Sequence, residues 1–489
     1  MQQSQIDYNR KWHVMAAVTM GIFLATIDGS IVNLALPTLV RDLQANFPTV
    51  QWVVLAYLLT LATLLLSVGR LADMLGKKTI YTLGFVIFTA GSVLCGLSPS
   101  IYWLIGFRVL QAVGAAMILA LGAAIVTEAF PPSERGKALG LLGSAVSIGI
   151  VVGPTLGGVL IGAFSWHAIF FVNLPVGIAG TLLSMRFVPD IRPAGRQRFD
   201  IPGALLLCAS LLCLLFALTL GQQLGFGDSR IMMLFAGFVA FIAAFIAVEL
   251  RVRQPMIDLR LFRNRLFSVN LLTGFLTFVA LAGSLFLMPF YLQNVLGYDT
   301  RQAGLLMASV PIGLGVASPI SGSLSDRFGT RRIAVIGLAA LLLTYVLLTT
   351  LSAETDAIGF ILRFAPLGIG MGIFQSPNNS AVMGTAPRER LGVVSGLLAI
   401  TRTVGQTTGI AVLGAVWAGR VLIYTGRPLP GGATSAPIEA QVVALHEAYL
   451  VMAALVAVGL GLGLWALAEE RRAKVAAALA VEPSTQEGA

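Results

Sequence analysis

The stretch GRLADMLGKK at residues 69–78 returns later in the chain as GSLSDRFGTRR at residues 322–332. A second stretch, PSERGKALGLL at residues 132–142, returns in the same way as PRERLGVVSGLL at residues 387–398. The offset between the copies stays near 253 to 256 residues. Because the offset is long and nearly constant, it indicates a duplication. The chain is therefore predicted to contain two equivalent halves, an arrangement that is common among membrane transporters.

Composition assigns these halves to a membrane. Of 489 residues, 57% are hydrophobic and 11% are charged, whereas about a quarter of the residues of a soluble protein are charged. Too few polar side chains remain to cover a soluble surface of this size. Apolar runs of ~20 residues fit helices that cross a bilayer better than the ~10-residue strands of a barrel. We therefore predict an all-α membrane protein.

Apolar runs bounded by charged or turn residues predict about fourteen transmembrane helices. We expect them near residues 13–36, 49–68, 79–97, 101–126, 137–162, 166–188, 202–220, 230–250, 266–291, 302–323, 332–351, 357–384, 391–418 and 448–468. Twelve of these helices would form two bundles of six. The two helices between residues 202 and 250 are left over as an extra pair between the bundles.

Basic residues give the orientation of the spans. The loops on one side, including the two copies of the repeated motif, carry most of the Lys and Arg. The loops on the other side carry only Arg41, Arg230, Arg301, Arg420 and Arg427. The positive-inside rule then places both termini in the cytoplasm, which requires an even number of spans. Membrane topology thus accounts for the net charge of +10, and we expect no nucleic-acid partner.

These features divide the chain into seven segments. They are a cytoplasmic N-terminus (1–12), an N-terminal six-helix bundle (13–190), two extra helices with cytoplasmic linkers (191–258), spans 9–13 of a C-terminal bundle (259–420), an extracytoplasmic loop (421–447), the last span (448–468) and a cytoplasmic tail (469–489). No leader cleavage site follows the first apolar run, so we interpret that run as an uncleaved span.

The motifs resemble those of the major facilitator superfamily, and within it those of the fourteen-spanner drug:proton antiporters. GRLADMLGKK is similar to the superfamily's loop signature after span two, and RVLQAVGAA (108–116) to its span-four signature. GIVVGPTLGG (149–158) resembles the span-five motif associated with antiporters. IDGSIVNLALP (27–37) and WHAIFFVNLPVG (166–177) resemble the span-one and span-six motifs of the fourteen-spanner exporters. The resemblance implies the major-facilitator fold and covers nearly the whole chain.

Asp28 is the only charged residue between Val14 and Val40. Intramembrane acids are costly and usually functional, and such a carboxyl group can bind and release a proton. On the first helix, Thr26, Ser30, Asn33 and Pro37 share one stripe and Asp28 lies roughly opposite it. Polarity on two sides indicates a helix buried in the bundle. We expect Asp28 to exchange a proton for substrate; the alternative is a structural hydrogen-bonding role.

Arg108 in span four shares a helical face with Gln111. A buried guanidinium stays charged and needs a partner, for which Asp28 is the candidate. The resemblance also implies a role for this arginine in proton coupling, and the alternative is a structural tie between helices. We therefore group Asp28, Arg108, Asn33 and Gln111 as the expected proton-coupling and substrate residues.

Small residues on span five form two stripes. Gly149, Gly153 and Gly157 form one, and Pro154 and Gly158 belong to the other. Stripes of small residues let helices approach closely in lipid, and proline permits a bend. Tight packing is expected here, together with a hinge or leak seal during rocking of the two halves. The antiporter assignment of this helix comes from the resemblance.

The repeated loop combines glycines, an acid and basic residues in both halves. We expect it to act as a conformational latch, because a solvated positive-inside loop requires no acid, yet an Asp recurs at the same place. The latch residues are Gly69, Arg70, Asp73, Gly76, Lys77, Asp326 and Arg327. In the second half, Arg402 lacks a basic counterpart in span five and can bind an anionic substrate group. FQSPNNS (374–380) either lines the cavity or kinks its helix. The candidate cavity residues are Arg402, Gln375, Asn378 and Asn379.

We therefore predict a proton-coupled secondary active exporter of amphipathic or cationic small molecules such as drugs, which works by alternating access. The alternatives are export of a specific endogenous metabolite or lipid, or proton symport on the same fold. The three histidines form no cluster and the cysteines lack metal spacing, so we expect neither an enzyme nor a metal site. The expected partners are the substrate, protons and the lipid bilayer, with no cofactor beyond the proton gradient. We expect a multi-pass monomer in the plasma membrane, as in a bacterial inner membrane.

Overall fold

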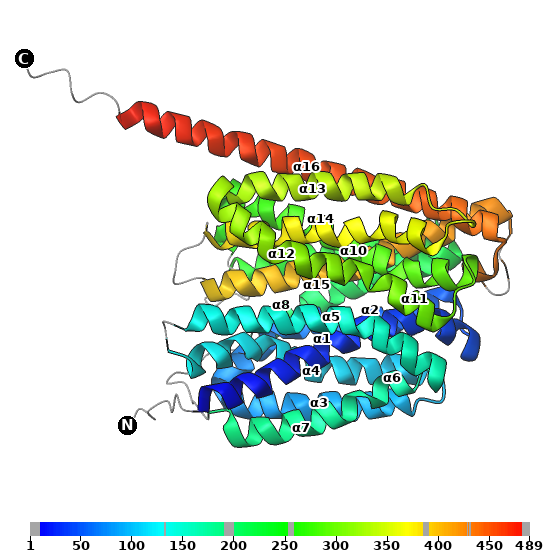
Figure 1. The fold of residues 1–489 in the computed structure, drawn as a ribbon, viewed down its shortest axis with the longest axis horizontal. Helices are drawn as coiled ribbons and strands as arrows, with labels where there is room; N and C mark the ends of the chain where they lie inside the picture. Colours follow the sequence, from blue (N-terminus) through cyan, green and yellow to red (C-terminus); the bar gives the residue numbers. More distant parts are fainter. Residues whose placement is uncertain are drawn as a thin grey trace, which may run out of the picture.

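The computed structural model describes residues 10–131, 134–189, 200–252, 259–384, 391–427, 429 and 432–481. This part of the chain is helical and contains no strand. Long helices run side by side in two bundles, with the N-terminal half below and the C-terminal half above in Figure 1. Thirteen helical segments are long and apolar enough to cross a bilayer, and α5 (Arg135–Ala163) adds the shorter apolar stretch Ile148–Ala163. The predicted membrane fold of about fourteen helices is confirmed.

Seven helices form the N-terminal bundle. They are α1 (Lys11–Asp42), α2 (Phe47–Leu75), α3 (Lys77–Gly96), α4 (Ile101–Ala129), α5 (Arg135–Ala163), α6 (Ala168–Phe171) and α7 (Asn173–Phe187). The short α6 and the longer α7 together make the sixth span. The extra pair is α8 (Ile201–Leu224) and α9 (Ser229–Glu249).

The C-terminal bundle repeats this arrangement. It contains the 3-10 helix η2 (Leu259–Arg263), α10 (Arg265–Phe290), the π-helical turn η3 (Tyr291–Val295), α11 (Thr300–Met307), α12 (Ser309–Phe328), α13 (Thr330–Leu348), α14 (Ala357–Gly384), α15 (Leu391–Thr425), the 3-10 helix η5 (Gly432–Ser435) and α16 (Ile438–Val481). The bundle thus has six spans, the second of which is made of α11 and α12.

We call the end at which α1 begins the inner end and the opposite end the outer end. Helix α16 also ends at the inner end (Figure 1), as an even number of spans requires. The last two spans are longer than the sequence predicts. Helix α15 continues to Thr425, and α16 already begins at Ile438. The predicted outer loop at 421–447 is therefore much shorter, and the predicted tail is helical as far as Val481.

The repeated loop has the same backbone geometry in both halves. Gly76 ends α2 with φ 97°, and Gly329 ends α12 with φ 93°. A positive φ of this kind is easy for glycine and costly for residues with a Cβ atom. Each glycine lets the next helix start at once, so α3 follows α2 and α13 follows α12 with only a single residue between them. This equivalence supports the duplication inferred from the sequence.

Prolines explain why two predicted spans are each divided in two. Pro175 has no N–H to donate to the carbonyl of Phe171, where α6 ends. Pro311 likewise cannot bond to the carbonyl of Met307, where α11 ends. Each proline removes one backbone hydrogen bond four residues upstream and so breaks the helix at that point. The chain still continues across the membrane in the same direction.

Close helix contacts rest on glycines that recur in the two halves. A Cβ atom on Gly114 of α4 would lie 2.3 Å from the Phe88 nitrogen of α3. In the equivalent pair of helices, a Cβ on Gly337 of α13 would lie 2.5 Å from the Phe374 nitrogen of α14. Lipid offers no hydrophobic drive between helices, so close backbone packing is a main source of their association.

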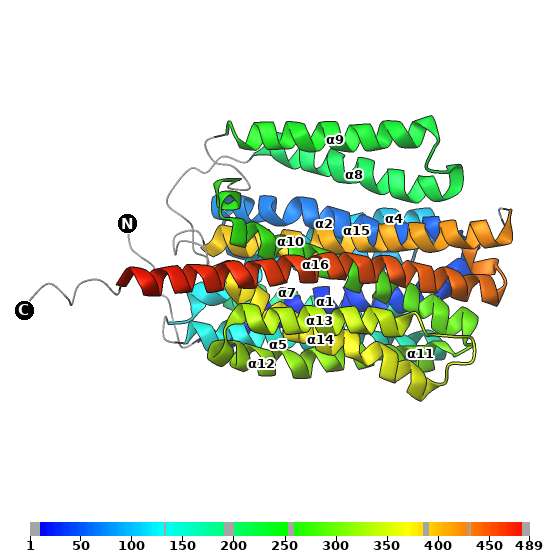
Figure 2. The ribbon, with the colours of Figure 1, turned by 90° about the horizontal axis from the view of Figure 1, so that it is seen from above.

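The pair α8–α9 stands beside the two bundles as a separate hairpin (Figure 2). Helix α8 packs against both α2 and α15, and the rings of Trp52 and Phe216 meet with centroids 4.7 Å apart. Since α2 and α15 belong to different bundles, α8 lies across one seam between the halves. Helix α9 packs mainly on α8.

Replacing Gly114 by alanine should destabilise the protein, because the new methyl group would collide with backbone atoms of α3. Overpacking of this kind costs about 1–3 kcal/mol. We expect a lower thermal midpoint of the detergent-solubilised protein, measured by size-exclusion after heating. The matched control is Gly106→Ala on the same helix, where a Cβ meets no atom within 4 Å. Equal midpoints for the two variants would contradict the packing argument.

Candidate functional site

The centre of the N-terminal bundle holds a buried ion pair. Arg108 Nη1 of α4 lies 2.5 Å from Asp28 Oδ2 of α1. The two side chains are 1% and 0% exposed. A buried charge is tolerated only if it is paired and hydrogen-bonded. The pairing that was predicted from the sequence is therefore present, between two helices that touch along the middle of the bundle.

Amide side chains complete the shell of the carboxylate. Gln111 Nε2 donates to Asp28 Oδ1 at 2.8 Å, and Asn173 Nδ2 of α7 donates to the same oxygen at 3.0 Å. Arg108 is held in turn, since its Nε donates to the Val53 carbonyl of α2 at 3.1 Å and its Nη1 to Gln111 Oε1 at 2.7 Å. Four helices of one bundle thus meet at one carboxylate.

A second layer fixes these donors. The Arg108 guanidinium lies 4.0 Å from the centroid of the Tyr57 ring, a cation–π geometry. Asn173 Nδ2 also donates to Ser92 Oγ at 3.0 Å, and Ser92 Oγ donates to the Phe170 carbonyl at 2.8 Å. The orientation of each group is therefore set by another, as in a preorganised polar network.

Three members of this network, Asn173, Tyr57 and Ser92, were not predicted from the sequence. Asn173 lies in the motif WHAIFFVNLPVG. An amide side chain inside an apolar span with a family motif could have indicated its role. Tyr57 and Ser92 had no comparable signal, because an aromatic residue or a serine in a membrane helix is ordinary. Their roles depend on which faces of α2 and α3 turn toward Arg108 and Asn173.

Asn33 does not join the ion pair, although it was grouped with it. It lies on the stripe opposite Asp28, where its Nδ2 makes a long 3.5 Å contact to the Gly29 carbonyl. Its Oδ1 is buried and has no hydrogen-bond partner in the described part of the chain. Five helical positions separate Asn33 from Asp28, which turns the two side chains to different faces.

The two stripes of α5 contact different neighbours. Cβ atoms on Gly153 and Gly157 would meet Ser30 Oγ and Ile31 Cγ1 of α1, the latter at 2.7 Å, and Gly149 likewise faces α1. Gly158 instead faces the other bundle, with its Cβ 2.7 Å from the Thr300 carbonyl. Pro154 does the same, because a Cβ on Gly304 of α11 would lie 2.4 Å from the Pro154 carbonyl. One stripe packs within the bundle and the other between bundles.

The repeated loop lies at the inner end. The side chains of Arg70, Asp73 and Asp326 lie outside the described residues, so their latch role remains a prediction. Gly69, the first residue of the motif, lies within α2, and Gly76 makes the turn. Arg327 is exposed. Lys77 forms an ion pair with Glu128 of α4. Glu128 was not anticipated. It ties the start of α3 to the inner end of α4.

Hydrogen bonds between the two bundles lie toward the outer end, among the side chains that the structure describes. Gln51 Nε2 of α2 donates to the Ile410 carbonyl of α15 at 3.5 Å, and Gln293 Nε2 of η3 donates to the Leu34 carbonyl of α1 at 3.2 Å. The ring of Phe47 packs on Phe286, Phe290 and Trp417. This distribution closes the bundles together at their outer ends.

The exposure of α1 also decreases toward the outer end. Phe23, Thr26 and Asn33 on one stripe are half-buried, whereas every residue from Leu34 to Leu39 is buried. The accessible stripe therefore stops where the bundles meet. The geometry corresponds to a transporter that is closed at its outer end.

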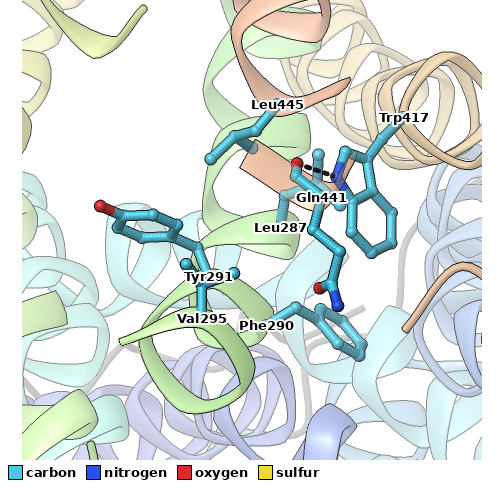
Figure 3. A pocket seen from close by; sticks show the side chains of 7 residues that line it. All are labelled: Leu287, Phe290, Tyr291, Val295, Trp417, Gln441 and Leu445. Atoms are coloured by element: carbon cyan, nitrogen blue, oxygen red, sulfur yellow. Dashed lines mark hydrogen bonds between the residues drawn. The ribbon is translucent and has the colours of Figure 1, made fainter. Parts of the chain in front are cut away.

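A small pocket adjoins the outer closure (Figure 3). Leu287, Phe290, Tyr291, Val295, Trp417, Gln441 and Leu445 line it. Trp417 Nε1 donates to the Gln441 carbonyl at 3.1 Å. The volume of about 10 Å³ has room for one water molecule, which excludes a drug-sized ligand in this pocket.

The candidate cavity residues of the C-terminal bundle separate into two groups. Asn378 of α14 is buried, and its Nδ2 donates to the Asn270 carbonyl of α10 at 3.2 Å, so it ties two helices together. Gln375, Asn379 and Arg402 are half-buried. No cluster of His, Cys, Asp or Glu able to hold a metal ion occurs within the described ranges.

Breaking the ion pair should cost more than removing it. Arg108→Gln leaves the Asp28 charge buried without its cation, for which we expect a loss of about 3–5 kcal/mol. Adding Asp28→Asn to that variant removes the orphaned charge, so the double variant should recover part of the loss. Thermal midpoints of the wild type, both single variants and the double variant measure the coupling. Strictly additive effects would show that the pair does not act as a unit.

Comparisons with known proteins agree with this architecture. The family model described as Major Facilitator Superfamily matches residues 18–410. The chain is 34% identical over 452 residues to the riboflavin transporter RibZ of Clostridioides difficile, covering 92% of this chain and 96% of that protein. It is 34% identical to the multidrug resistance protein Stp of Mycobacterium tuberculosis (strain CDC 1551 / Oshkosh), covering 88% of this chain and 80% of the relative. The crystal structure of a bacterial homologue of the human lysosomal transporter Spinster, inward-facing and unoccupied, matches with a TM-score of 0.67 and 19% identity, covering 94% of this chain and 97% of that one.

The family model spans most of the chain, and the relatives match over most of their length. Both point to the same family as the two bundles and the repeated loop do. The relatives are transporters and not enzymes. The chain is therefore a multi-pass membrane transporter of small molecules that belongs to the Major Facilitator Superfamily.

Proposed function

We propose that this protein is a proton-coupled exporter of amphipathic small molecules, which works by alternating access in the plasma membrane. The observation that carries the proposal is the buried Asp28–Arg108 pair in the centre of the N-terminal bundle. Intramembrane ionisable groups of this kind mark proton relays and substrate paths. The relative named a multidrug resistance protein supports export of foreign compounds.

The hydrogen-bond inventory explains how a proton would act on this site. An ionised carboxylate only accepts hydrogen bonds, and Asp28 accepts them from Arg108, Gln111 and Asn173. Oδ1 already accepts two hydrogen bonds, so a proton there must displace Gln111 or Asn173. A proton on Oδ2 instead removes the negative charge that holds the Arg108 guanidinium. Either way, binding a proton weakens the contacts that hold Asp28. The protonation state of Asp28 would thus be coupled to the packing of α1 against α4 and α7.

The ion pair does not lie on the accessible stripe of α1. Ser30, which belongs to that stripe, donates to the Gly149 carbonyl of α5 at 3.2 Å, while Asp28 faces α4 and α7. The proton site and the substrate path would therefore lie on two sides of one helix. Coupling between them would be carried by movement of α1, not by direct competition for one carboxylate.

Alternating access would open the outer end and close the inner one. The contacts of Gln51 and Gln293 must then break. Inward movement of one proton charge across 100 mV supplies about 2.3 kcal/mol, which sustains roughly a fifty-fold concentration gradient of a neutral substrate. If a monovalent cation leaves in exchange for one proton, the electrical contributions cancel and only the pH gradient drives export.

The relative named a riboflavin transporter supports a narrower alternative. It matches over almost the full length of both chains, so transport of one specific metabolite is the second candidate function. Ethidium and riboflavin distinguish the two candidates as test substrates, because one is a foreign lipophilic cation and the other a polar metabolite.

Asp28→Asn should abolish pH-driven accumulation of substrate in proteoliposomes while leaving substrate exchange at equal pH intact. Exchange needs no net proton movement, so it reports whether the variant is folded and able to bind. Accumulation of ethidium and of riboflavin under an imposed pH gradient provides the measurement. The control is Asp356→Asn, an acid whose Oδ1 accepts from the Gly359 N–H at the start of α14. Accumulation by Asp28→Asn at the wild-type level would refute coupling through this residue.

A disulfide across the outer closure should stop transport reversibly. Gly414 lies against Gln51, since a Cβ on Gly414 would collide with the Gln51 side chain. Gln51→Cys and Gly414→Cys together replace that long side chain by two short thiols at the contact. In a background without Cys95, Cys208 and Cys213, oxidation should block transport and a reductant should restore it. Each single-cysteine variant is the control, and undiminished transport by the cross-linked protein would contradict alternating access at this interface.

A further inference from the structure

Arg402 is an arginine inside the membrane part of α15. It is half-buried and makes no hydrogen bond or ion pair with any residue that the structure describes. Three other arginines of the helices form ion pairs. Arg108 pairs with Asp28, Arg331 with Glu470, and Arg420 with Glu447. Gln406, one helical turn beyond Arg402, is likewise half-buried and makes no side-chain hydrogen bond to the described part of the chain.

Neighbours on α15 fix the direction in which Arg402 and Gln406 point. Gly405 and Gly409 face α10, where their Cβ atoms would lie 2.9 Å from Phe278 Cβ and 2.1 Å from the Val279 carbonyl. Ile410 and Gly414 face α2 through Gln51. At 3.6 residues per turn, positions 402 and 406 fall between these two directions. Since α10 and α2 belong to different bundles, the two side chains point to the space between the halves.

The same face of α15 changes along its length. Toward the outer end it is covered, with Ile410 and Leu413 buried beneath α2 and α10. Toward the inner end, Ala399, Arg402 and Gln406 are half-buried. The pair therefore lies on the inner side of the outer closure, where the bundles are less tightly joined. Figure 2 shows α15 next to both α2 and α10.

Among the side chains that the structure describes, no acid forms an ion pair with Arg402. Asp28 already accepts hydrogen bonds from Arg108, Gln111 and Asn173 and faces the interior of the other bundle. An unpaired guanidinium in a membrane is costly. Its planar fork of N–H donors matches the oxygens of a carboxylate, sulfonate or phosphate. The amide of Gln406 adds a further donor on the same face.

We propose that Arg402 and Gln406 bind the anionic group of an amphipathic substrate in the space between the bundles. This inference deepens the proposed function and rests on it for the transport step. Among amphipathic substrates, it predicts a preference for those that carry a carboxylate, sulfonate or phosphate. Such an anion can arrive as a soluble compound or as a lipid headgroup, and we assign the site to the soluble compound.

Two matched fluorescent probes test the assignment. They are 1-anilinonaphthalene-8-sulfonate and its uncharged parent N-phenyl-1-naphthylamine, which differ by the sulfonate. Binding to the full-length protein in phosphatidylcholine nanodiscs, corrected for empty nanodiscs, gives both affinities. The variants are Arg402→Gln, Arg402→Lys and Gln406→Ala. The control is Arg363→Gln. Arg363 lies near the outer end of α14 and donates hydrogen bonds to the Thr350 hydroxyl and the Gly359 carbonyl.

We expect Arg402→Gln to weaken binding of the sulfonate about 10- to 100-fold, as for loss of a hydrogen bond to a charged group. Binding of the uncharged probe should stay unchanged in every variant. Arg402→Lys should retain part of the sulfonate affinity, since it keeps the charge and loses the fork. Gln406→Ala should weaken binding of the sulfonate probe by a smaller factor than Arg402→Gln does. If Arg402→Gln does not fold, the lysine and Gln406 variants decide the question.

Equal sulfonate affinity in the wild type and in Arg402→Gln would overturn the proposal. It would also be overturned if adding phosphatidylglycerol abolished sulfonate binding to the wild type, because the site would then belong to lipid headgroups. Failure of this inference leaves pH-driven accumulation through Asp28 intact. Conversely, probe binding that depends on Arg402 without any pH-driven transport would leave the anion site standing and refute the proposed function.

Discussion

The structure depends on a constraint that the membrane imposes: a charge in its interior must find a partner. Asp28 and Arg108 satisfy it with each other, and the helices that carry their neighbours are arranged around them. Gln111, Asn173 and the Val53 carbonyl complete the shell, so α1, α2, α4 and α7 are held at one point. Because a buried pair contributes little net stability when intact and costs much when broken, its position constrains how these helices can move.

The duplication makes it informative that the described residues of the other half contain no such buried pair. Both halves share the glycine turn after the second helix and the close contacts of Gly114 and Gly337. On the helix equivalent to α5, however, the second half carries Arg402, which forms no ion pair with any described residue. One half thus contains a compensated charge and the other an uncompensated one. The two bundles have equivalent backbones but different charges, which agrees with a proton site in the N-terminal bundle and a substrate-binding charge in the C-terminal bundle.

The sequence predicted the membrane class, the number of spans and the duplication, because these depend on composition, run length and spacing. It also predicted that Asp28, Arg108 and Gln111 belong together, since charges in apolar helices leave few choices. It could not place Tyr57 or Ser92, which act only through the faces that α2 and α3 present to the pair. The division of spans six and ten by Pro175 and Pro311 was missed because hydropathy does not register a broken backbone bond. The early start of α16 at Ile438 was missed because Glu439, His446 and Glu447 interrupt the apolar run there.

The hairpin of α8 and α9 has a consequence for how compounds dissolved in the lipid would reach the interior. Two seams separate the bundles, one where α5 meets α11 and one where α2 meets α15. Helix α8 covers the second seam through its contacts with α2 and α15, including the Trp52–Phe216 ring contact. A molecule diffusing within a leaflet would meet a barrier on that side. Lateral entry is therefore one-sided, and a lipophilic compound would approach past α5 and α11.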